Sequence, residues 1–166
     1  MKKFYLFALF SFAFCEITNA QQPLSFTETV QVDSTSKKQL FNKAKRWFAD
    51  TYKNSKEVLQ IEDSATGEIL GKAIFLYYSQ NYISYTINIL VRDGKYKCDI
   101  YDFILPNSAL VSGLLSTETS YPRMPFTINK KAYNKAWEEA KMLSELEAKS
   151  LMNNLKNAMK KPTEDW

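Results

Sequence analysis

The stretch from Tyr82 to Leu105, YISYTINILVRDGKYKCDIYDFIL, decides the fold of this chain. Apolar and polar residues alternate along both halves of the stretch, and the alternation breaks once, at Asp93 and Gly94. An Asp-Gly pair between two runs of β-branched and aromatic residues is typical of a tight hairpin turn, because both residues tolerate positive φ angles. The stretch therefore predicts two long antiparallel strands that meet at this turn.

Alternation also divides the side chains of these two strands between two faces of a sheet. One face is predicted to be core, and it contains Ile83, Tyr85, Ile87, Ile89, Val91, Tyr96, Cys98, Ile100 and Ile104. The other face combines polar and aromatic side chains. Its candidate binding residues are Tyr82, Thr86, Asn88, Lys97, Asp99, Tyr101 and Phe103.

The second face has two interpretations. An antiparallel sheet commonly leaves one face in water, so the face could be ordinary surface. However, Tyr82, Tyr101 and Phe103 would then be exposed aromatic side chains, and exposed apolar patches often mark interaction sites. The alternative is therefore a binding platform, on which the rings stack against a ligand and Lys97 and Asp99 supply polar contacts.

The chain before this stretch predicts a strand, a helix and a second hairpin. Leu24–Val32 alternates with period two, as strands do. Ser36–Gln39 fits a capping box, and a helix with one aromatic side is predicted over Lys37–Tyr52. Glu57–Asp63 and Glu68–Tyr78 are predicted to pair as antiparallel strands, so that four consecutive strands form a meander.

The chain after the stretch predicts a long loop and a closing helix. Pro106–Thr127 is rich in turn-forming residues, and loops of this length are usually functional or mobile. One helical turn is predicted inside the loop, at residues 110–115. Asn129–Lys160 has the spacing of an amphipathic helix, and Pro162 ends it, so residues 161–166 are predicted to be a frayed tail.

Residues 1–20 are expected to be a secretory signal peptide. Two lysines precede an apolar run, Phe4–Phe14, which is too short for the about 20 residues of a membrane-spanning helix and is followed by a small-residue cleavage site. Lipid attachment at Cys15 is disfavoured, because Phe14 stands where a small residue is needed. We expect export to the periplasm or the extracellular space, and a single mature domain over residues 21–160 without an integral membrane span.

Cys98 would be the only cysteine of the mature chain, so no intramolecular disulfide is possible. It lies on the apolar side of its strand, whereas a reactive thiol needs cationic and accessible surroundings. We predict that Cys98 is a buried packing residue.

Three further stretches resemble a known family. They are FTETVQV at Phe26–Val32, KKQLFNKAKRWFADTYKNSKEVLQIED at Lys37–Asp63 and GEILGKA at Gly67–Ala73. The chain resembles the exported bacterial domain-of-unknown-function family 4468, which has a TATA-binding-protein-like fold. The resemblance implies an α+β fold, with a curved antiparallel sheet of about five strands, two helices on one face and the concave face open. It implies no activity, and the nucleic-acid role of the fold's namesake does not follow from the fold.

Several chemistries are excluded by what the sequence lacks. The chain contains no histidine, which excludes Ser-His-Asp and Cys-His catalysis and histidine-ligated zinc. It has no P-loop, dinucleotide or G-x-S-x-G motif. Its formal net charge of +4 is mild, and bases alternate with acids along the chain, which disfavours nucleic acid as a partner. The sequence predicts neither a cofactor nor a metal site.

Two functions remain. The favoured one is a non-catalytic binding or interaction module whose open sheet face contacts an unidentified ligand or cell-envelope partner. The alternative is a small histidine-independent carboxylate hydrolase that acts on an extracellular polymer through Asp99, Glu62 or the Pro106–Thr127 loop. Asp99 and Asp102 are the nearest carboxylate pair in sequence, but their odd spacing places them on opposite faces, with Asp102 toward the core.

Overall fold

The computed structural model describes residues 21–79, 81–106, 110–123 and 129–161, which form an α+β domain. In chain order its elements are β1 (Phe26–Gln31), α1 (Lys37–Thr51), α2 (Ser55–Val58), β2 (Leu59–Asp63), β3 (Glu68–Tyr78), β4 (Asn81–Arg92), β5 (Lys95–Leu105), β6 (Gly113–Leu114) and α3 (Lys130–Lys160). The predicted order of strand, helix, four strands and long helix is confirmed, with α2 and β6 added. The expected signal peptide and residues 162–166 of the expected tail lie outside the described residues.

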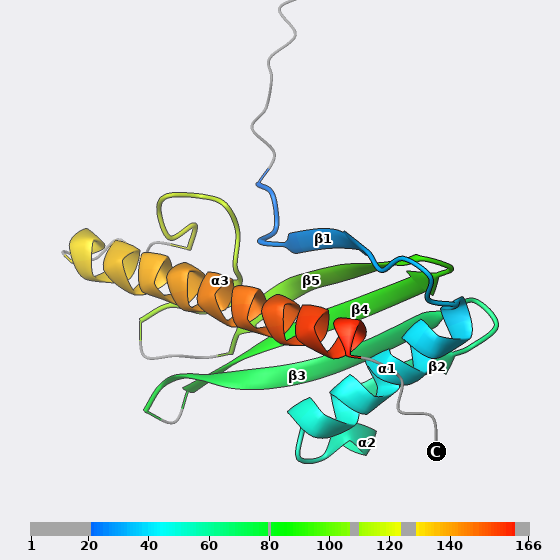
Figure 1. Cartoon of the computed structure of the whole chain (residues 1–166). Helices are drawn as coiled ribbons and strands as arrows, with labels where there is room; N and C mark the ends of the chain where they lie inside the picture. The colour runs from blue at the N-terminus through cyan, green and yellow to red at the C-terminus, as the bar shows by residue number, and fades with distance from the viewer. Residues whose placement is uncertain (1–20, 80, 107–109, 124–128, 162–166) are drawn as a thin grey trace, which may run out of the picture.

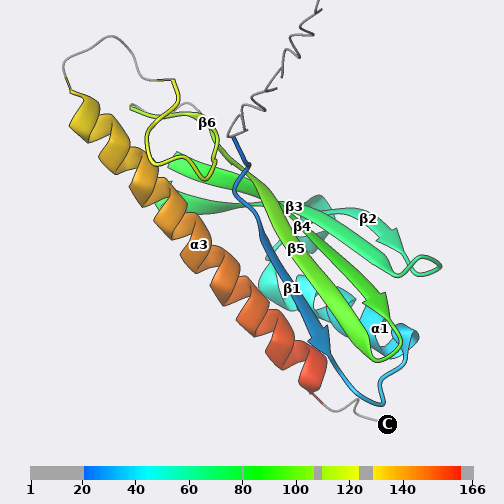
Figure 2. The same cartoon turned by 90° about the horizontal axis from the view of Figure 1, so that it is seen from above.

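The strands form one antiparallel sheet in the order β1-β5-β4-β3-β2, and β6 pairs with the end of β5. Strands β2 to β5 are neighbours both in sequence and in space, as predicted for a meander. The first strand, β1, instead joins the sheet beside β5 (Figures 1 and 2). The strand predicted at Glu57–Asp63 begins only at Leu59, because Ser55–Val58 forms the one-turn helix α2.

Both long helices lie against the same face of the sheet, as Figure 1 shows. The predicted capping box starts α1, with the Ser36 hydroxyl and the Gln39 side chain each accepting a backbone N–H bond. The side of α3 that faces the sheet includes fully buried Ala140, Ser144 and Ala148, whose small size allows close approach. The remaining buried residues of the two helices are Leu40, Phe41, Ala44, Trp47, Phe48, Trp137, Leu151, Leu155 and Met159.

The hairpin between β4 and β5 turns at Asp93 and Gly94, as predicted, but only Gly94 has a positive φ, of 73°. The Asp93 carboxylate accepts a hydrogen bond from the backbone N–H of Lys37 at 2.7 Å. The Gly94 N–H donates to the Thr35 carbonyl at 2.9 Å. These bonds join the turn to the start of α1, so the loop geometry is set by a tertiary contact as well as by the two turn residues.

A β-bulge in β5 reverses part of the predicted face assignment. Thr86 lies opposite Tyr101 and Ser84 lies opposite Ile104, so Asp102 and Phe103 together oppose one residue of β4. Asp102 takes a φ of 55° and is exposed rather than directed to the core. The side chains after it change faces because a bulge adds one residue to the alternation.

The consequence is two corrections. The prediction that Phe103 lies on the open face is wrong, because Phe103 is 0% exposed and packs edge-on against Phe26 and stacked on Tyr85 in the core. The prediction that Ile104 is core is also wrong, because its side chain is 43% exposed. The other predicted core residues of β4 and β5 are buried: Ile83, Tyr85, Ile87, Ile89, Val91, Tyr96, Cys98 and Ile100.

The segment after β5 packs against the end of the sheet. The helical turn predicted at residues 110–115 is wrong, because Gly113 and Leu114 form β6 and Ser116 forms a bridge with Pro23. Tyr121 is buried against the rings of Tyr133 and Trp137. Among the described residues, no helix is both long and apolar enough to cross a membrane.

Candidate functional site

The face of the sheet opposite α1 and α3 is the candidate site, and we call it the open face. Six of the predicted binding residues belong to this side of the sheet, although Thr86 is buried there at 4% exposure, and the bulge removes only Phe103. On β4 these are Tyr82, Thr86 and Asn88, and on β5 they are Lys97, Asp99 and Tyr101. The register places Asn88 opposite Asp99 and Thr86 opposite Tyr101, so the structure brings four of these residues into two adjacent rows.

The polar part of the open face is held by side-chain bonds. Asp99 accepts a hydrogen bond from the Thr27 hydroxyl at 2.8 Å and pairs with the Lys97 ammonium at 2.9 Å. The Asn88 amide nitrogen donates to a Glu68 carboxylate oxygen at 3.0 Å. Each bond crosses from one strand to the next or joins residues on the same face, so these contacts orient the polar side chains toward one another.

Burial affects the hydrogen bonding of one group in this polar part and the pKa of another. Among the described residues the Asn88 amide oxygen has no hydrogen-bond partner, although it is buried. Burial raises the pKa of the Tyr101 hydroxyl, and the negative charges of Asp102, Asp99 and Glu68 add to the effect. The Tyr101 hydroxyl is therefore a neutral donor at any physiological pH, which suits hydrogen bonding to a ligand.

One end of the open face is apolar, and we call it the apolar end. The register forms a row across four strands, Ile74 of β3, Ser84 of β4, Ile104 of β5 and Leu114 of β6. The next row places Leu76 opposite Tyr82. Exposed fractions are 62% for Ile74, 56% for Leu76 and 44% for Tyr82. Large apolar side chains that gather at this exposure commonly mark an interaction surface.

Sequence reasoning missed most of this apolar end. It identified Tyr82, but not Ile74, Leu76, Ile104 or Leu114. The signal for the β3 residues is the unbroken apolar run Ala73–Tyr78, because a strand with one wet face should alternate and this run does not. The exposure of Ile104 could not be predicted, because the bulge reverses the alternation before it. Leu114 could not be predicted, because a two-residue strand is too short to show alternation.

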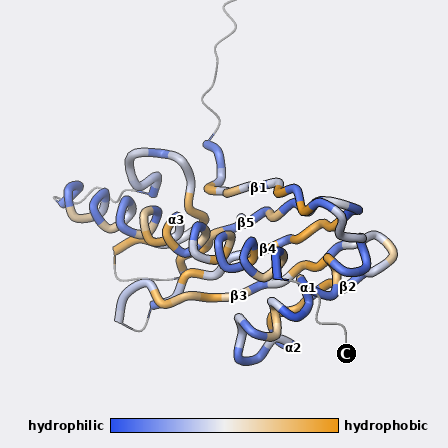
Figure 3. Tube along the Cα trace, viewed as in Figure 1, coloured by the Kyte–Doolittle hydropathy of each residue, from blue (hydrophilic) through white to orange (hydrophobic). Residues whose placement is uncertain are grey.

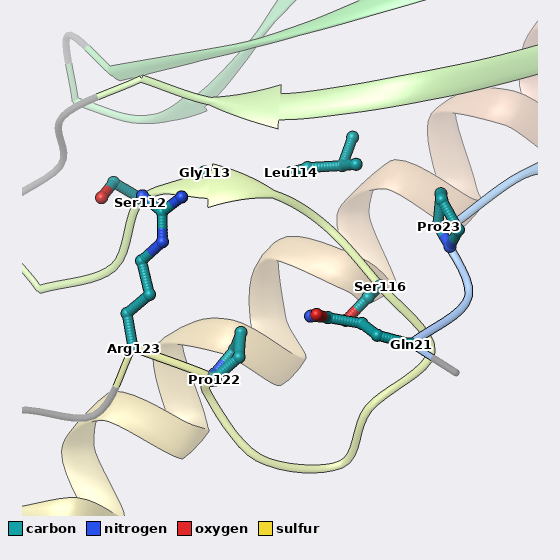
Figure 4. Close-up of a pocket in the computed structure, with 8 residues that line it drawn as sticks. All are labelled: Gln21, Pro23, Ser112, Gly113, Leu114, Ser116, Pro122 and Arg123. Atoms are coloured by element: carbon teal, nitrogen blue, oxygen red, sulfur yellow. The ribbon is translucent and has the colours of Figure 1, made fainter. Parts of the chain in front are cut away.

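A cleft of about 350 Å³ lies beside the apolar end. Figure 4 shows its lining, which comes from the start of the domain, β6 and the segment after β6. The Gln21 amide donates to the Ser116 hydroxyl at 3.2 Å across the cleft, and the Arg123 guanidinium lies beside Gly113. Leu114 is the one residue that belongs to both the cleft and the apolar end. The predicted binding residues do not line it.

Asp99 and Glu68, two carboxylates of the open face, are already engaged. Asp99 is paired with Lys97, and Glu68 accepts a bond from Asn88. Glu62, the other carboxylate considered for hydrolysis, forms an ion pair with Lys45 at 2.7 Å. Within the part of the chain that the structure describes, no three acidic or cysteine side chains gather in a way that could hold a metal ion. The geometry gives no specific support to carboxylate hydrolysis.

The comparison with protein families matches the part of the chain that contains the first five strands of the sheet. Residues 26–105, from β1 to the end of β5, match the model described as "Domain of unknown function (DUF4468) with TBP-like fold". This part of the chain is a DUF4468 domain. The match ends where the long loop begins, so it contains all the candidate binding residues but neither β6 nor α3.

Two solved structures have a fold similar to that of this chain. A DUF4468 family protein from Bacteroides ovatus is 13% identical, with a TM-score of 0.62 over 87% of this chain and 90% of the other. A TBP-like protein from Parabacteroides distasonis is 16% identical, with a TM-score of 0.55 over 85% of this chain and 96% of the other. At these identities the likeness shows the fold alone. No curated protein matches the chain.

Proposed function

We propose that this DUF4468 protein is an exported, non-catalytic binding module that takes an amphipathic cell-envelope ligand, a lipid or a glycan, on its open face. The observation that carries the proposal is the position of the apolar end directly beside the polar rows. Tyr82 contributes an exposed ring, and Tyr101 supplies a hydroxyl group in the row next to Ser84 and Ile104, whereas Thr86 in that row is only 4% exposed. Such a ligand would place its apolar or ring surface on Ile74, Leu76 and Tyr82, and its polar groups on Tyr101 and Asn88.

The paired polar side chains support binding more than catalysis. Because Asp99 and Glu68 are held by neutralising or donating partners, neither is arranged as a free acid or base. The Asn88 oxygen is an acceptor without a described partner, but it is buried, so a ligand donor would reach it only after the side chain turns outward. Binding sites typically combine an apolar surface with a few oriented polar groups of this kind.

The test is ligand capture on glycan and lipid arrays with the Tyr82→Ala/Tyr101→Ala double variant. We expect the unsubstituted protein to bind a subset of the arrayed glycans or lipids. The double variant should give a binding signal at least about tenfold lower, because stacking aromatic groups commonly dominate binding energy.

A matched control is available on the opposite side of the molecule. Met142 and Leu146 are exposed on the outer side of α3. The double variant Met142→Ala/Leu146→Ala removes a similar amount of exposed apolar surface without touching the open face, and it should capture the same array members as the unsubstituted protein. Equal capture by the Tyr82→Ala/Tyr101→Ala variant would reject the proposed function.

A further inference from the structure

The second half of β3 forms an open edge of the sheet. Strand β2 covers β3 only from Glu68 to Gly71, where Leu59 is its last partner. Within the described residues no strand pairs with β3 on this side from Lys72 to Tyr78. Figure 2 shows β2 beside one end of β3 only. The backbone groups on this side of Lys72–Tyr78 can therefore accept another strand.

This edge has few of the features that normally prevent pairing between molecules. Edge strands are usually protected by charges, proline, shortness or β-bulges, and the one irregularity of β3 lies near its end, between Leu76 and Tyr78. The six-residue edge strand β1 carries Glu28, which pairs with Lys156, and the edge strand β2 carries Glu62. The free part of β3 reads KAIFLYY, with its one charge at the first position. Figure 3 shows β3 as a strongly hydrophobic strand.

We propose that a second copy of this chain pairs with the free edge, so that β3 and its two-fold mate join two sheets into one. In an antiparallel arrangement centred on Phe75, Ile74 lies opposite Leu76 of the second copy. The regular part of this pairing ends at Leu76, because β3 has an irregular register between Leu76 and Tyr78. On the other side it ends before Gly71, where β2 begins and α2 approaches β3.

Self-complementarity is the reason to assign a second copy to this edge. On the open face, Ile74 and Leu76, which are 62% and 56% exposed in the monomer, would pack side by side in two apolar cross-strand pairs. The Lys72 residues of the two copies lie at opposite ends of the paired segment, so the two lysines are kept apart. Isologous contacts of this kind close at a dimer.

The dimer would also enlarge the open face. Each copy would contribute its rows from β3 to β6, and the two apolar ends would meet at the new strand pair. This goes beyond the proposed function, because pairing depends on the edge of β3 whether or not the open face binds a ligand.

The experiment is sedimentation velocity from micromolar to about millimolar concentration, the range in which weak association is detected. We expect the unsubstituted chain to shift from one to two monomer masses as its concentration rises. Ile74→Lys places a charge in the middle of both apolar pairs and should remain a monomer. The control Leu114→Lys adds the same charge to the apolar end but away from β3, and it should dimerise as the unsubstituted chain does.

Cysteine cross-linking tests the register and remains informative if Ile74→Lys folds poorly. In a mixture of the Ile74→Cys and Leu76→Cys proteins, opposed Cα atoms should lie within disulfide reach, and mild oxidation should produce a covalent dimer. Each protein alone places its cysteines diagonally, about 7–8 Å apart, and should cross-link much less. Cross-linking of the unsubstituted chain gives the background.

The two proposals fail separately. A monomer at every concentration, a dimer that persists in Ile74→Lys, or equal loss of the dimer in Leu114→Lys would overturn the β3 interface. Ligand capture is tested separately with the Tyr82→Ala/Tyr101→Ala variant, because Ile74 and Leu76 belong to both surfaces whereas Tyr82 and Tyr101 do not belong to the β3 edge. If the Tyr82→Ala/Tyr101→Ala variant loses ligand capture but still forms the dimer, the result supports both the proposed function and the interface.

Discussion

Ser84 of β4 lies opposite Ile104 of β5. Counting two residues on from the Thr86–Tyr101 pair would instead place Phe103 opposite Ser84, on the open face. One additional residue, Asp102, accounts for the difference. It takes a left-handed backbone conformation and shifts the rest of β5 by one position. This single residue decides which side chains form the core at that end of the sheet and which form the candidate binding surface.

Asp102→Val should destabilise the protein by about 1–2 kcal/mol, because a β-branched side chain is strained at positive φ. Asp102→Gly removes the same carboxylate without that strain, and it should be at least as stable as the unsubstituted chain. Urea unfolding of the two variants measures the difference. Equal stability of the valine and glycine variants would contradict the left-handed conformation.

Phe103→Ala should cost about 3–5 kcal/mol of unfolding free energy, because it removes a ring packed against Phe26 and Tyr85. Ile104→Ala, at the next position, removes an exposed side chain and should cost less than about 1 kcal/mol. Without the bulge the order of the two effects would be reversed. Denaturant titration of both variants therefore tests the face assignment directly.

Cys98 should be inert to thiol reagents in the folded protein. It is 1% exposed, and burial raises the pKa of its thiol to about 12, with the charges of Asp99 and Glu28 adding to the effect. Since the thiolate is the reactive form, labelling of a chain that starts at Gln21 should be at least about 100-fold slower in native buffer than in denaturant at the same pH. Similar rates in both conditions would show that the thiol is accessible.

Glu147 on α3 should make stability depend on pH. Burial raises the pKa of its carboxyl above the ordinary value of 4.5, so the folded protein retains a proton that the unfolded chain has lost. Stability from this group is complete below the ordinary value and is lost as pH rises through the raised value. Glu147→Gln should therefore raise the melting temperature at neutral pH and have little effect below pH 4.

Glu145→Gln is the matched control for that prediction. It removes a carboxylate two residues away that is exposed and paired with Lys149 at 2.6 Å. Because this pair is at the surface, its loss should change the melting temperature only slightly. A higher melting temperature for Glu145→Gln than for Glu147→Gln at neutral pH would contradict the role given to burial.

Much of the fold could be predicted because its signals are local. The alternation on both sides of Asp93 and Gly94, the capping box at Ser36–Gln39 and the long amphipathic pattern of α3 each depend on neighbouring residues alone. Burial of Cys98 followed from the same alternation and is confirmed.

The candidate site could be predicted only in part because two of its determinants are not local. A bulge depends on how two strands pair, and nothing around Asp102 distinguishes it from an ordinary strand residue in sequence. The contribution of Leu114 depends on the pairing of a two-residue strand with the end of β5. The apolar run in β3 was visible, but whether a strand covers it is decided by where β2 begins.

The placement of β1 has a consequence for how the chain folds. Phe26 lies opposite Ile100, so β1 can join the sheet only after the distant β5 is available. Strands β2 to β5, by contrast, close through short connections and can assemble early, since nearby contacts require less loop closure. The strand that leads the sequence is therefore expected to be the last of the five to dock, and a chain interrupted before β5 is complete would leave it without a place to pair.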